Sequence, residues 1–549
     1  MGAPRFSIVT PVYETPAGVL RAMLRSVRRQ RFPDWELCLV DDGSKQPHVA
    51  QALDAAAAGD RRIRVERRDA NAGIVAASND ALAMACGEFV VLLDHDDKLH
   101  PEALQLVDEA IRATPEADYL YSDEDKLDAK GMHVGPFFKP DWSPERLRTQ
   151  MYTCHLAVLR RSLVEAVGGF DAEFEGSQDW DLILRVSERA RRVVHVPRVL
   201  YHWRMLETSA AGGGEEAKPW AFEAGTRAVQ AHCDRIGLPA RVERDLDHPG
   251  VYHLQPRLRR EPSVSIVIPT AGQTREVRFE QIVLVSHCVR SIVETSTYEN
   301  YEIVCVTDSS TDPTVLDELA SIAGDRLKLV PYDRPFSFSA KINAGAVRSE
   351  GEHLLLLNDD MEVIAADWIE RMAMYSAHPG IGAVGGRLLL EDGRIQHAGV
   401  QFENGGFPGH PYRGFSREFA GYSNCVLVAQ NLLAVTGACL MTPREAFEQV
   451  GGLTTTFPIN YNDIDYCLKL AAAGLRVVYD PDTVLYHFES SSRSSDVDDW
   501  EMEMLIDRWA SLTVPDPYSN PNLKYGTPRL SSPFQWARRR RPRLRRKVA

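Results

Sequence analysis

Three carboxylates stand close together in the segment 92–98, which reads LLDHDDK. Asp94, Asp96 and Asp97 come at the end of an apolar run that is typical of a buried β-strand. Oxygen ligands of this kind suit Mg²⁺ or Mn²⁺, which proteins usually hold through one or two carboxylates together with phosphate oxygens. The same residues also suit a solvated turn before a helix, so the segment alone leaves both interpretations open.

A second acidic segment, SQDWDLILR at 177–185, places Asp179 and Asp181 at the start of an amphipathic helical pattern. Acidic residues here commonly cap a helix or interact with its dipole, which is the structural interpretation. The functional interpretation is that Asp179 is a general base that accepts a proton from an attacking hydroxyl. A third candidate is His202 in VLYHWR, which follows an apolar strand and could complete the ligand set of a metal.

Each of these segments has a counterpart further along the chain. The pairs are SIVTP (7–11) and SIVIP (265–269), LVDDGS (39–44) and CVTDSS (305–310), GEFVVLLDHD (87–96) and GEHLLLLNDD (351–360), VGGF (167–170) and VGGL (450–453), QDWDLIL (178–184) and NDIDYCL (462–468), and LYHWR (200–204) and LYHFE (485–489). The order is the same and the spacing nearly constant, and that spacing is too long for a solenoid repeat. The chain therefore contains two copies of one domain.

The elements that must position these residues follow the same rhythm in each copy. In the first copy we expect helices to alternate with strands over 7–10, 37–40, 63–65 and 89–93. Short, continuous apolar strands are typical of a parallel sheet that helices cover on both faces. Ligands bind beyond the carboxyl ends of such strands, which is where the acidic motifs fall. The predicted fold class is α/β, with two doubly wound, mostly parallel sheets.

The repeat also predicts how the chain is divided. We expect a first domain over 1–250, a second over 263–525, and a Pro- and Arg-rich linker over about 245–262. A helical pattern near 497–512 closes the second copy. The remaining residues, 526–549, form a basic tail.

Composition excludes several classes of protein. The 549 residues are 44% hydrophobic and 26% charged, which is ordinary for a globular protein and excludes global disorder. A formal net charge of −14 argues against a general nucleic-acid binder. No apolar stretch is long enough for a membrane-spanning helix, and the N-terminus lacks the pattern of a signal peptide. Nine cysteines without a CxxC pair make a zinc site or a disulfide framework unexpected and favour a cytoplasmic compartment.

The C-terminal residues 536–549, WARRRRPRLRRKVA, carry seven Arg and one Lys without any acid. One interpretation of such a charge run is a solvated terminus. The other is an electrostatic anchor to anionic lipid, because each basic residue near such a surface contributes about 1 kcal/mol before screening. Nucleic-acid binding by the tail is not expected, since the rest of the chain is acidic and has no basic or aromatic stripe.

Together, SIVTPVYE, LVDDGS, LLDHDD, SQDWD and YHWR resemble the inverting glycosyltransferases of family 2, which have the GT-A fold. The second copy resembles the rhamnosyltransferase-like branch through LLNDDMEVIAADWI, HAGV at 397–400, YNDID and LYHFESSSR. The tandem arrangement is similar to that of bacterial O-antigen and cell-surface polysaccharide biosynthesis proteins. The resemblance covers about residues 5–525, and its motifs are specific for the superfamily but weak for the sugar.

The resemblance implies roles for residues of the first copy. Asp94 and Asp96 match the DxD motif that binds the divalent cation and the diphosphate of the nucleotide-sugar, and Asp97 contacts the donor sugar or the acceptor. Asp179 matches the catalytic base and His202 the extra metal ligand. The segments that hold the nucleoside correspond to Thr10, Pro11, Tyr13, Glu14 and Asp41 or Asp42.

In the second copy Asp463 matches the base, and the remaining matches are Asn358, Asp360 and His487 for the metal and Pro269, Asp308 and Asp359 for the donor. Two departures matter. Thr307 stands where the first copy has Asp41, so nucleoside recognition is expected to differ. Asn358 removes one charge from the metal motif, although rhamnosyltransferase-like relatives commonly carry Asn there, so a different donor or weaker metal binding is expected.

The resemblance thus implies a bifunctional inverting hexosyl- or rhamnosyltransferase that uses UDP- or dTDP-sugars with Mn²⁺ or Mg²⁺. A cation stabilises the charge that develops on the leaving diphosphate, and a base such as Asp179 accelerates attack by about 10²–10⁴-fold. The expected acceptor is a polyprenyl-diphosphate-linked surface glycan at the inner face of the cell membrane, with no nucleic-acid partner.

Two alternatives remain open. In the first, only one copy is catalytic and the other is a glycan-binding or scaffolding module with the same fold. The second is a sugar-nucleotide nucleotidyltransferase, which needs a Gly-rich basic loop after the first strand. The segments PVYETPAG and PTAGQTRE, which stand at that place in the two copies, do not have the pattern of such a loop.

Overall fold

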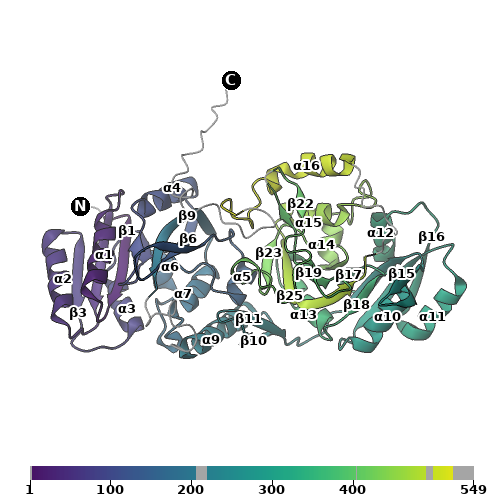
Figure 1. Cartoon of the computed structure of the whole chain (residues 1–549), viewed down its shortest axis with the longest axis horizontal. Helices are drawn as coiled ribbons and strands as arrows, with labels where there is room; N and C mark the ends of the chain where they lie inside the picture. The colour runs from purple at the N-terminus through teal and green to yellow at the C-terminus, as the bar shows by residue number, and fades with distance from the viewer. Residues whose placement is uncertain (1–2, 206–218, 404, 490–498, 524–549) are drawn as a thin grey trace, which may run out of the picture. The chain divides into compact units, whose positions relative to one another are not determined.

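The chain packs as two units, each built around one copy of the repeat (Figure 1). The computed structural model describes residues 3–205, 219–403, 405–489 and 499–523. The first unit is assembled from Met1–Trp142, Thr153–Ala224 and Asn520–Ala549, and the second from Ser143–Tyr152 and Gly225–Ser519. The boundaries expected near residues 250 and 263 stay predictions.

The sheet of the first unit has the strand order β3-β2-β1-β4-β8-β6-β9-β5, with β7 paired to β6. Its strands are β1 (Phe6–Val12), β2 (Trp35–Asp41), β3 (Ile63–Arg67), β4 (Phe89–Leu92), β5 (Lys98–Leu99), β6 (Ala117–Leu127), β7 (His133–Phe137), β8 (Ala157–Arg160) and β9 (Arg192–Arg204). The run β3-β2-β1-β4 is parallel, whereas β8 is antiparallel to β4 and β6. The carboxyl ends of β1, β2 and β4 therefore meet at one edge of the sheet.

The second unit repeats this order as β16-β15-β12-β17-β24-β19-β25-β18, with β20 paired to β19 and β23 to β25. Its strands are β12 (Val264–Thr270), β15 (Tyr301–Asp308), β16 (Leu327–Tyr332), β17 (His353–Leu357), β18 (Met361–Val363), β19 (Ile381–Leu389), β20 (Ile395–His397), β23 (Gln430–Leu432), β24 (Cys439–Pro443) and β25 (Arg476–His487). The shared strand order confirms the α/β fold class with two copies of one sheet.

Among the described residues of the second unit, three hairpins lie outside its main sheet. They are β10 (Ala240–Arg244) with β11 (Tyr252–Pro256), β13 (Thr274–Val277) with β14 (Glu280–Val283), and β21 (Gln401–Phe402) with β22 (Pro408–Gly409). Strand β11 falls in the stretch that the sequence pattern suggested as a linker.

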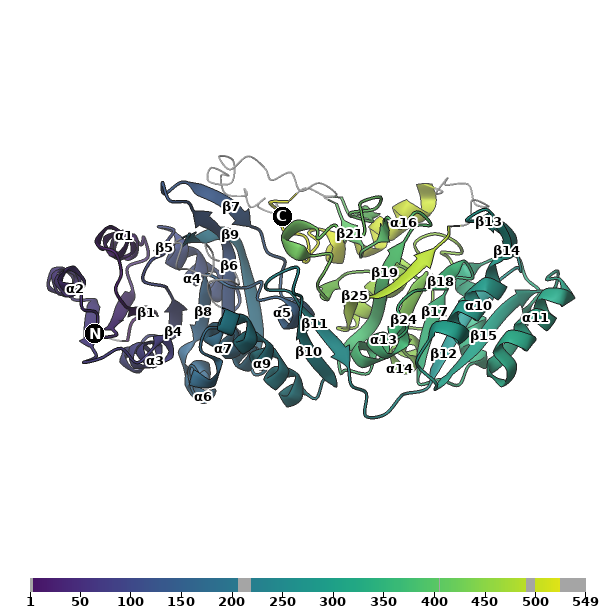
Figure 2. The ribbon, with the colours of Figure 1, turned by 60° about the horizontal axis from the view of Figure 1, so that its bottom comes forward.

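Helices cover both faces of the first sheet. Consecutive residues of a strand point to opposite faces, so neighbouring residues of β1 pack against different helices. Ile8 of β1 packs with α1 (Ala17–Arg28) and α2 (Pro47–Gly59), whereas the next residue, Val9, packs with α3 (Ile74–Met84). Figure 2 shows α1 and α3 on either side of β1. Within the described residues, the remaining α-helices of the two units are α4 (Ala103–Ala113), α5 (Pro144–Thr149), α6 (Arg161–Ala166), α7 (Gln178–Ser187), α9 (Pro219–Ile236), α10 (Leu284–Thr295), α11 (Pro313–Ala323), α12 (Phe338–Arg348), α13 (Trp368–Ser376), α14 (Arg444–Gln449), α15 (Asn462–Ala472) and α16 (Asp499–Thr513).

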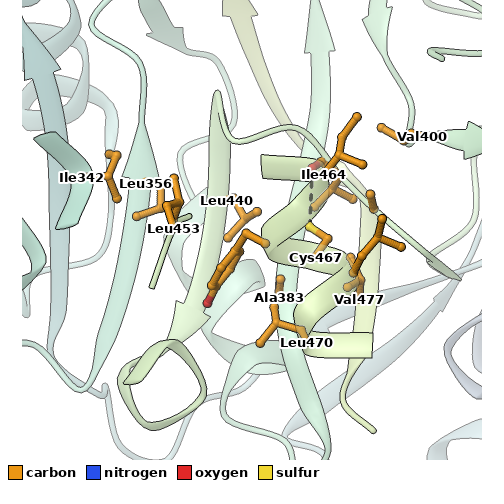
Figure 3. Packing of buried hydrophobic residues seen from close by; sticks show 14 of the residues in the cluster. Ile342, Leu356, Ala383, Val400, Leu440, Leu453, Ile464, Cys467, Leu470 and Val477 are labelled. Carbon is orange, nitrogen blue, oxygen red and sulfur yellow. Dashed lines mark hydrogen bonds between the residues drawn. The ribbon is translucent and has the colours of Figure 1, made fainter. Parts of the chain in front are cut away.

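The core of the second unit joins α12 and α15 to the central strands. Ile342 of α12, Leu356 of β17 and Leu440 of β24 belong to the same buried cluster as Leu470 of α15 and Val477 of β25 (Figure 3). Burying a leucine or valine side chain of this kind contributes about 1.5–3 kcal/mol. This packing fixes the strands whose ends carry the acidic motifs.

Two expectations concern the membrane. Among the residues that the structure describes, no helix is both long and apolar enough to cross a bilayer. The basic segment 536–549, which is the candidate for contact with anionic lipid, lies outside the described residues.

Candidate active sites

The acidic turn of the first unit directly follows β4. The hydroxyl of Tyr201 accepts the backbone N–H of Asp94 (3.2 Å) and donates to the carboxylate of Asp97 (2.6 Å). The backbone N–H of Arg204 also donates to Asp97 (2.6 Å), and its Nε donates to the carbonyl oxygen of Asp96 (2.8 Å). Asp97 is fully buried, whereas Asp94 and Asp96 are half-buried. The protein therefore uses Asp97 to hold the turn.

Crowding of negative charge makes this turn suited to a cation. Burial raises the pKa of Asp94, and the nearby charges of Asp96 and Asp179 raise it further, although His155 opposes them. Burial and the charges of Asp96 and Asp94 raise the pKa of Asp97 well above its usual range. A bound cation would favour the ionised form of each of these groups, so the residues present fit a divalent metal.

His155 belongs to this cluster although no sequence motif pointed to it. One ligand atom each of Asp94, Asp97 and His155 lie within 4.8 Å of one another. The His155 ring stacks on that of Tyr201, with centroids 4.5 Å apart and an interplanar angle of 23°. The signal was hidden because the second copy has Ala438 at the equivalent position, so the repeat does not reveal it.

His202, the predicted metal ligand, lies beside Asp125. Its Nδ1 is 2.7 Å from Oδ1 of Asp125, and the other oxygen of Asp125 is 2.9 Å from Nδ1 of His133. Burial opposes ionisation, but hydrogen bonds from His133 and His202 lower the pKa of Asp125, so both imidazoles donate to a carboxylate. Among the described residues no hydrogen bond or ion pair joins His202 to the acidic turn. The structure does not bring this predicted ligand to Asp94 or Asp96.

In the second unit the predicted metal residues do lie together. Nε2 of His487 is 3.1 Å from Oδ1 of Asp360 and 3.2 Å from Nδ2 of Asn358. Nδ1 of the same ring is 2.7 Å from Oε1 of Gln396, which leaves Nε2 directed at the acidic turn. Asp359 accepts a hydrogen bond from the hydroxyl of Thr270 (2.7 Å). A carboxylate and an imidazole are thus in place for a metal here as well.

A difference in strand register explains the two histidines. In the first unit β5 pairs Lys98 with His202, whereas in the second unit β18 pairs Met361 with His487. The spacing that relates GEFVVLLDHD to GEHLLLLNDD aligns Met361 with Asp97, so the pairing differs by one residue. A shift of one residue turns a side chain to the other face of the strand. In the first unit Tyr201 faces the acidic turn and its neighbour His202 faces away.

The two candidate bases occupy equivalent helix starts. Asp179 lies half-buried in the first turn of α7, and Asp463 lies half-buried in the first turn of α15. The backbone N–H of Gly437 donates to Oδ2 of Asp463 (2.8 Å). The second acid of each motif is buried and pairs with protein groups, Asp181 with an arginine one turn later and Asp465 with Thr454 and Trp509. Only the first acid of each motif is therefore a candidate base.

The candidates for nucleoside binding in the first unit lie in or just after β1 and at the end of β2, and they are Thr10, Pro11, Tyr13, Glu14, Asp41 and Asp42. Asp41 accepts the N–H of Ser44 (3.0 Å), and Asp42 accepts the N–H of Ala72 and of Gly73 (3.0 Å each). Glu14 accepts the N–H of Lys45. These carboxylates shape the loops that border the site.

The corresponding carboxylate of the second unit, Asp308, has different partners. Asp308 ends β15, and its Oδ1 is 2.7 Å from Nζ of Lys341, which is fully buried and also donates to the carbonyl oxygen of Thr270 (2.9 Å). Pro269 lies one residue earlier in β12. Position 341 corresponds to Ala77 in the first copy. Lys341 was missed because a lysine within an apolar helix gives no motif.

A cavity of about 520 Å³ lies beside His487. Its walls include Phe488 and Glu489 of the main sheet region and Arg275, Arg278 and Phe279 of the β13–β14 hairpin. The carboxylates of Glu391, Asp392 and Glu489 line it as well, so the lining carries both signs of charge.

Known proteins resemble both copies. Residues 7–168 match the model of "Glycosyl transferase family 2", and residues 262–510 match that of "Glycosyltransferase like family 2". The chain is 40% identical over 535 residues to "Uncharacterized protein y4gI" of Sinorhizobium fredii, covering 95% of this chain and 58% of that protein. It is 38% identical over 528 residues to "O-antigen biosynthesis protein RfbC" of Myxococcus xanthus, covering 95% and 40%.

A shorter relative matches one part of the chain. A "PGL/p-HBAD biosynthesis glycosyltransferase" of Mycobacterium tuberculosis is 32% identical over 208 residues, covering 37% of this chain and 78% of that protein. The chain thus covers 78% of this shorter relative but only about half the length of the two longer relatives. With two family matches in tandem, the chain belongs to glycosyltransferase family 2.

Proposed function

We propose that the chain is a bifunctional inverting glycosyltransferase that transfers sugars from UDP- or dTDP-sugar donors to a growing cell-surface glycan. The observation that carries the proposal is the same set of groups at the carboxyl end of β4 and of β17. In both units an acidic turn, a carboxylate in the first turn of a helix and an imidazole belong to one sheet edge. The printed names of the Myxococcus and Mycobacterium relatives support glycan synthesis.

The metal would be held by Asp94 and Asp96 in the first unit and by Asn358, Asp360 and His487 in the second. A bound Mn²⁺ or Mg²⁺ supplies positive charge against the leaving diphosphate. The cavity beside His487 would receive part of the donor. The donor is thereby bound through its phosphates.

Asp179 and Asp463 would each accept the proton of the acceptor hydroxyl as it attacks the anomeric carbon. Each lies in the first turn of a helix, where the helix dipole favours negative charge. The Gly437 N–H fixes the direction of the Asp463 carboxylate without protonating it. A single displacement without a covalent intermediate inverts the configuration at the sugar carbon.

The acceptor is proposed to be a polyprenyl-diphosphate-linked glycan, and the protein to work in the cytoplasm at the inner face of the membrane. The basic segment 536–549 would attract anionic lipid there.

A second candidate function is that only the first unit is catalytic and the second binds glycan. Two observations favour it: Asn358 replaces a metal-binding carboxylate, and Asp463 is already bonded to a backbone N–H.

The test uses the full chain with a panel of nucleotide sugars and Mn²⁺, and it measures nucleotide release and the product formed. We expect Asp179→Asn to abolish use of one donor and Asp463→Asn to abolish use of the other, each by about 10²–10⁴-fold. Asp54→Asn, at a surface position on α2, is the matched control. Full product from Asp463→Asn would establish the second candidate, and no release from the unmodified chain with any donor would contradict both.

A further inference from the structure

The imidazole beside the acidic turn comes from a different strand in each unit. In the second unit it is His487, the last residue of β25, with Nε2 3.1 Å from Asp360. In the first unit it is His155, which stands two residues before β8. A ring nitrogen of His155 lies within 4.8 Å of a carboxylate oxygen of Asp94 and of Asp97.

His155 is held in place by several groups, of which Tyr201 also holds the acidic turn. Its backbone N–H donates to Oε2 of Glu124 (3.0 Å), and its carbonyl oxygen accepts from the ammonium of Lys139 (2.5 Å). Its ring stacks on Tyr201, whose hydroxyl bonds both Asp94 and Asp97, and meets the edge of Trp203 at 5.6 Å. One tyrosine thus fixes the ring relative to the carboxylates.

His202 is occupied on the other face of β9. Its Nδ1 donates to Asp125, which also accepts from His133, and the two imidazole rings meet edge to face at 4.5 Å. To reach Asp94, His202 would have to leave a buried carboxylate that it and His133 share. Leaving would give up a hydrogen bond to a buried charged group, so the arrangement favours His202 where it lies.

The strand pairings show that the imidazole beside the acidic turn comes from non-equivalent positions in the two units. Leu92 pairs with Ala157 in the first unit, and its equivalent Leu356 pairs with Leu440 in the second. Two residues before these partners stand His155 and Ala438 respectively. The methyl group of Ala438 cannot bind a metal. In the second unit the imidazole is instead supplied by His487 at the end of β25.

We propose that His155, and not His202, is the imidazole ligand of the divalent cation that Asp94 binds in the first unit. The inference rests on the proposed function, because it takes for granted that the first unit uses a divalent cation. One imidazole with carboxylate oxygens suits Mn²⁺ and leaves coordination positions for diphosphate oxygens.

The test titrates Mn²⁺ alone into the full chain carrying Asp360→Asn, which removes the carboxylate of the second site. Free Mn²⁺ is measured by electron paramagnetic resonance. We expect His155→Ala and His155→Gln to raise the dissociation constant at least about tenfold and His202→Ala to leave it unchanged. The nitrogen modulation that a bound imidazole gives in a pulsed spectrum should disappear with His155→Ala and persist with His202→Ala.

The outcomes separate this inference from the proposed function. Mn²⁺ binding that both His155 variants leave unchanged, or that His202→Ala alone weakens, overturns the inference while leaving the function in place. No Mn²⁺ binding by the Asp360→Asn chain overturns both. Thermal unfolding of each variant shows whether it folds. If His155→Ala does not fold, the Mn²⁺ affinity of His155→Gln, whose side chain is closer to histidine in size and polarity, decides between the outcomes.

Discussion

The two units share their strand order and their motif order, yet they differ where the acidic turn meets the last long strand. In the second unit Asp360 and His487 are in contact, as the repeat suggests. In the first unit the equivalent His202 is one residue out of register and bonds Asp125 instead. A repeated motif therefore does not determine which side chain faces the site, because a shift of one residue exchanges the two faces of a strand.

The units also differ in the groups that pair with the carboxylate at the end of their second strand. Asp42 is bonded to two backbone N–H groups, whereas Asp308 pairs with the buried Lys341. Each carboxylate also has a cationic partner, because Nε of Arg68 lies 3.2 Å from Oδ1 of Asp42, but only Lys341 is fully buried. The expectation that nucleoside recognition differs between the units stays a prediction.

The largest effect should come from crowding the base of one unit only. A Cβ at Gly437 would lie 2.9 Å from Cβ of Asp463, closer than real contacts allow, so Gly437→Ala must displace the base. Misplacement by about 1 Å can cost about 10²-fold in rate. We expect such a loss in the second unit's transfer alone, measured by product analysis with each donor. Gly18→Ala, which meets nothing within 4 Å, is the control, and equal loss in both units would contradict the comparison.

Lys341→Met should destabilise the chain by about 2–3 kcal/mol, less than for a fully buried pair because Asp308 is 24% exposed. Urea unfolding of the full chain measures the change. Lys328→Met is the matched control, since Lys328 pairs with Glu302 and Glu350 at the surface and should contribute about 1 kcal/mol or less. If the two variants lose the same stability, the buried pair is not the special feature of the second unit.

The units should respond differently to pH. Burial opposes protonation, but the hydrogen bonds that His253 of the second unit donates to Asp482 and Asp245 raise the pKa of its imidazole to about 9. This value is above that of an unfolded histidine, so the stabilisation is complete below about pH 6.5 and is lost as the pH rises through about 9. In the first unit, burial lowers the pKa of His100 to about 4, so that residue costs stability as the pH falls from about 6.5 to about 4.

His253→Gln should therefore lower the free energy of unfolding by about 2 kcal/mol near pH 6 and hardly at all near pH 9.5. Urea unfolding at the two pH values measures it, and His100→Gln serves as the comparison because it should remove the acid-side loss instead. A loss of the same size at both pH values would show that His253 contributes by packing and not by charge.

The smallest effect concerns the missing charge at Asn358. Asn358→Asp should lower the Mn²⁺ concentration for half-maximal transfer in the second unit about tenfold, because each added carboxylate strengthens binding of a divalent cation. The measurement uses an Asp179→Asn background, so that only the second unit turns over. The reverse change, Asp94→Asn in an Asp463→Asn background, should weaken the first unit by a similar factor. If the Mn²⁺ concentration for half-maximal transfer is unchanged in both variants, the charge at this position is not the basis of the difference between the units.

Much of the fold was predictable from the sequence. The strands at Phe6–Val12, Trp35–Asp41 and Phe89–Leu92 lie over the expected apolar runs, and α1 buries the face that its periodicity marks. The motifs also placed Asp94, Asp179 and their counterparts at the carboxyl ends of strands or the start of helices. The roles of these residues stay predictions until the variants are measured.

What the sequence determined by itself was the presence of two copies, the order of their elements and the residues that follow each strand, because these depend on local spacing along the chain. The tertiary structure decided which imidazole faces the acidic turn, that His202 pairs with Asp125, and that Lys341 neutralises Asp308. Such contacts depend on the register between strands and on packing between segments far apart in the chain. Neighbouring residues in a strand face opposite sides, so a difference of one position in that register, which no local pattern records, reassigned the histidine.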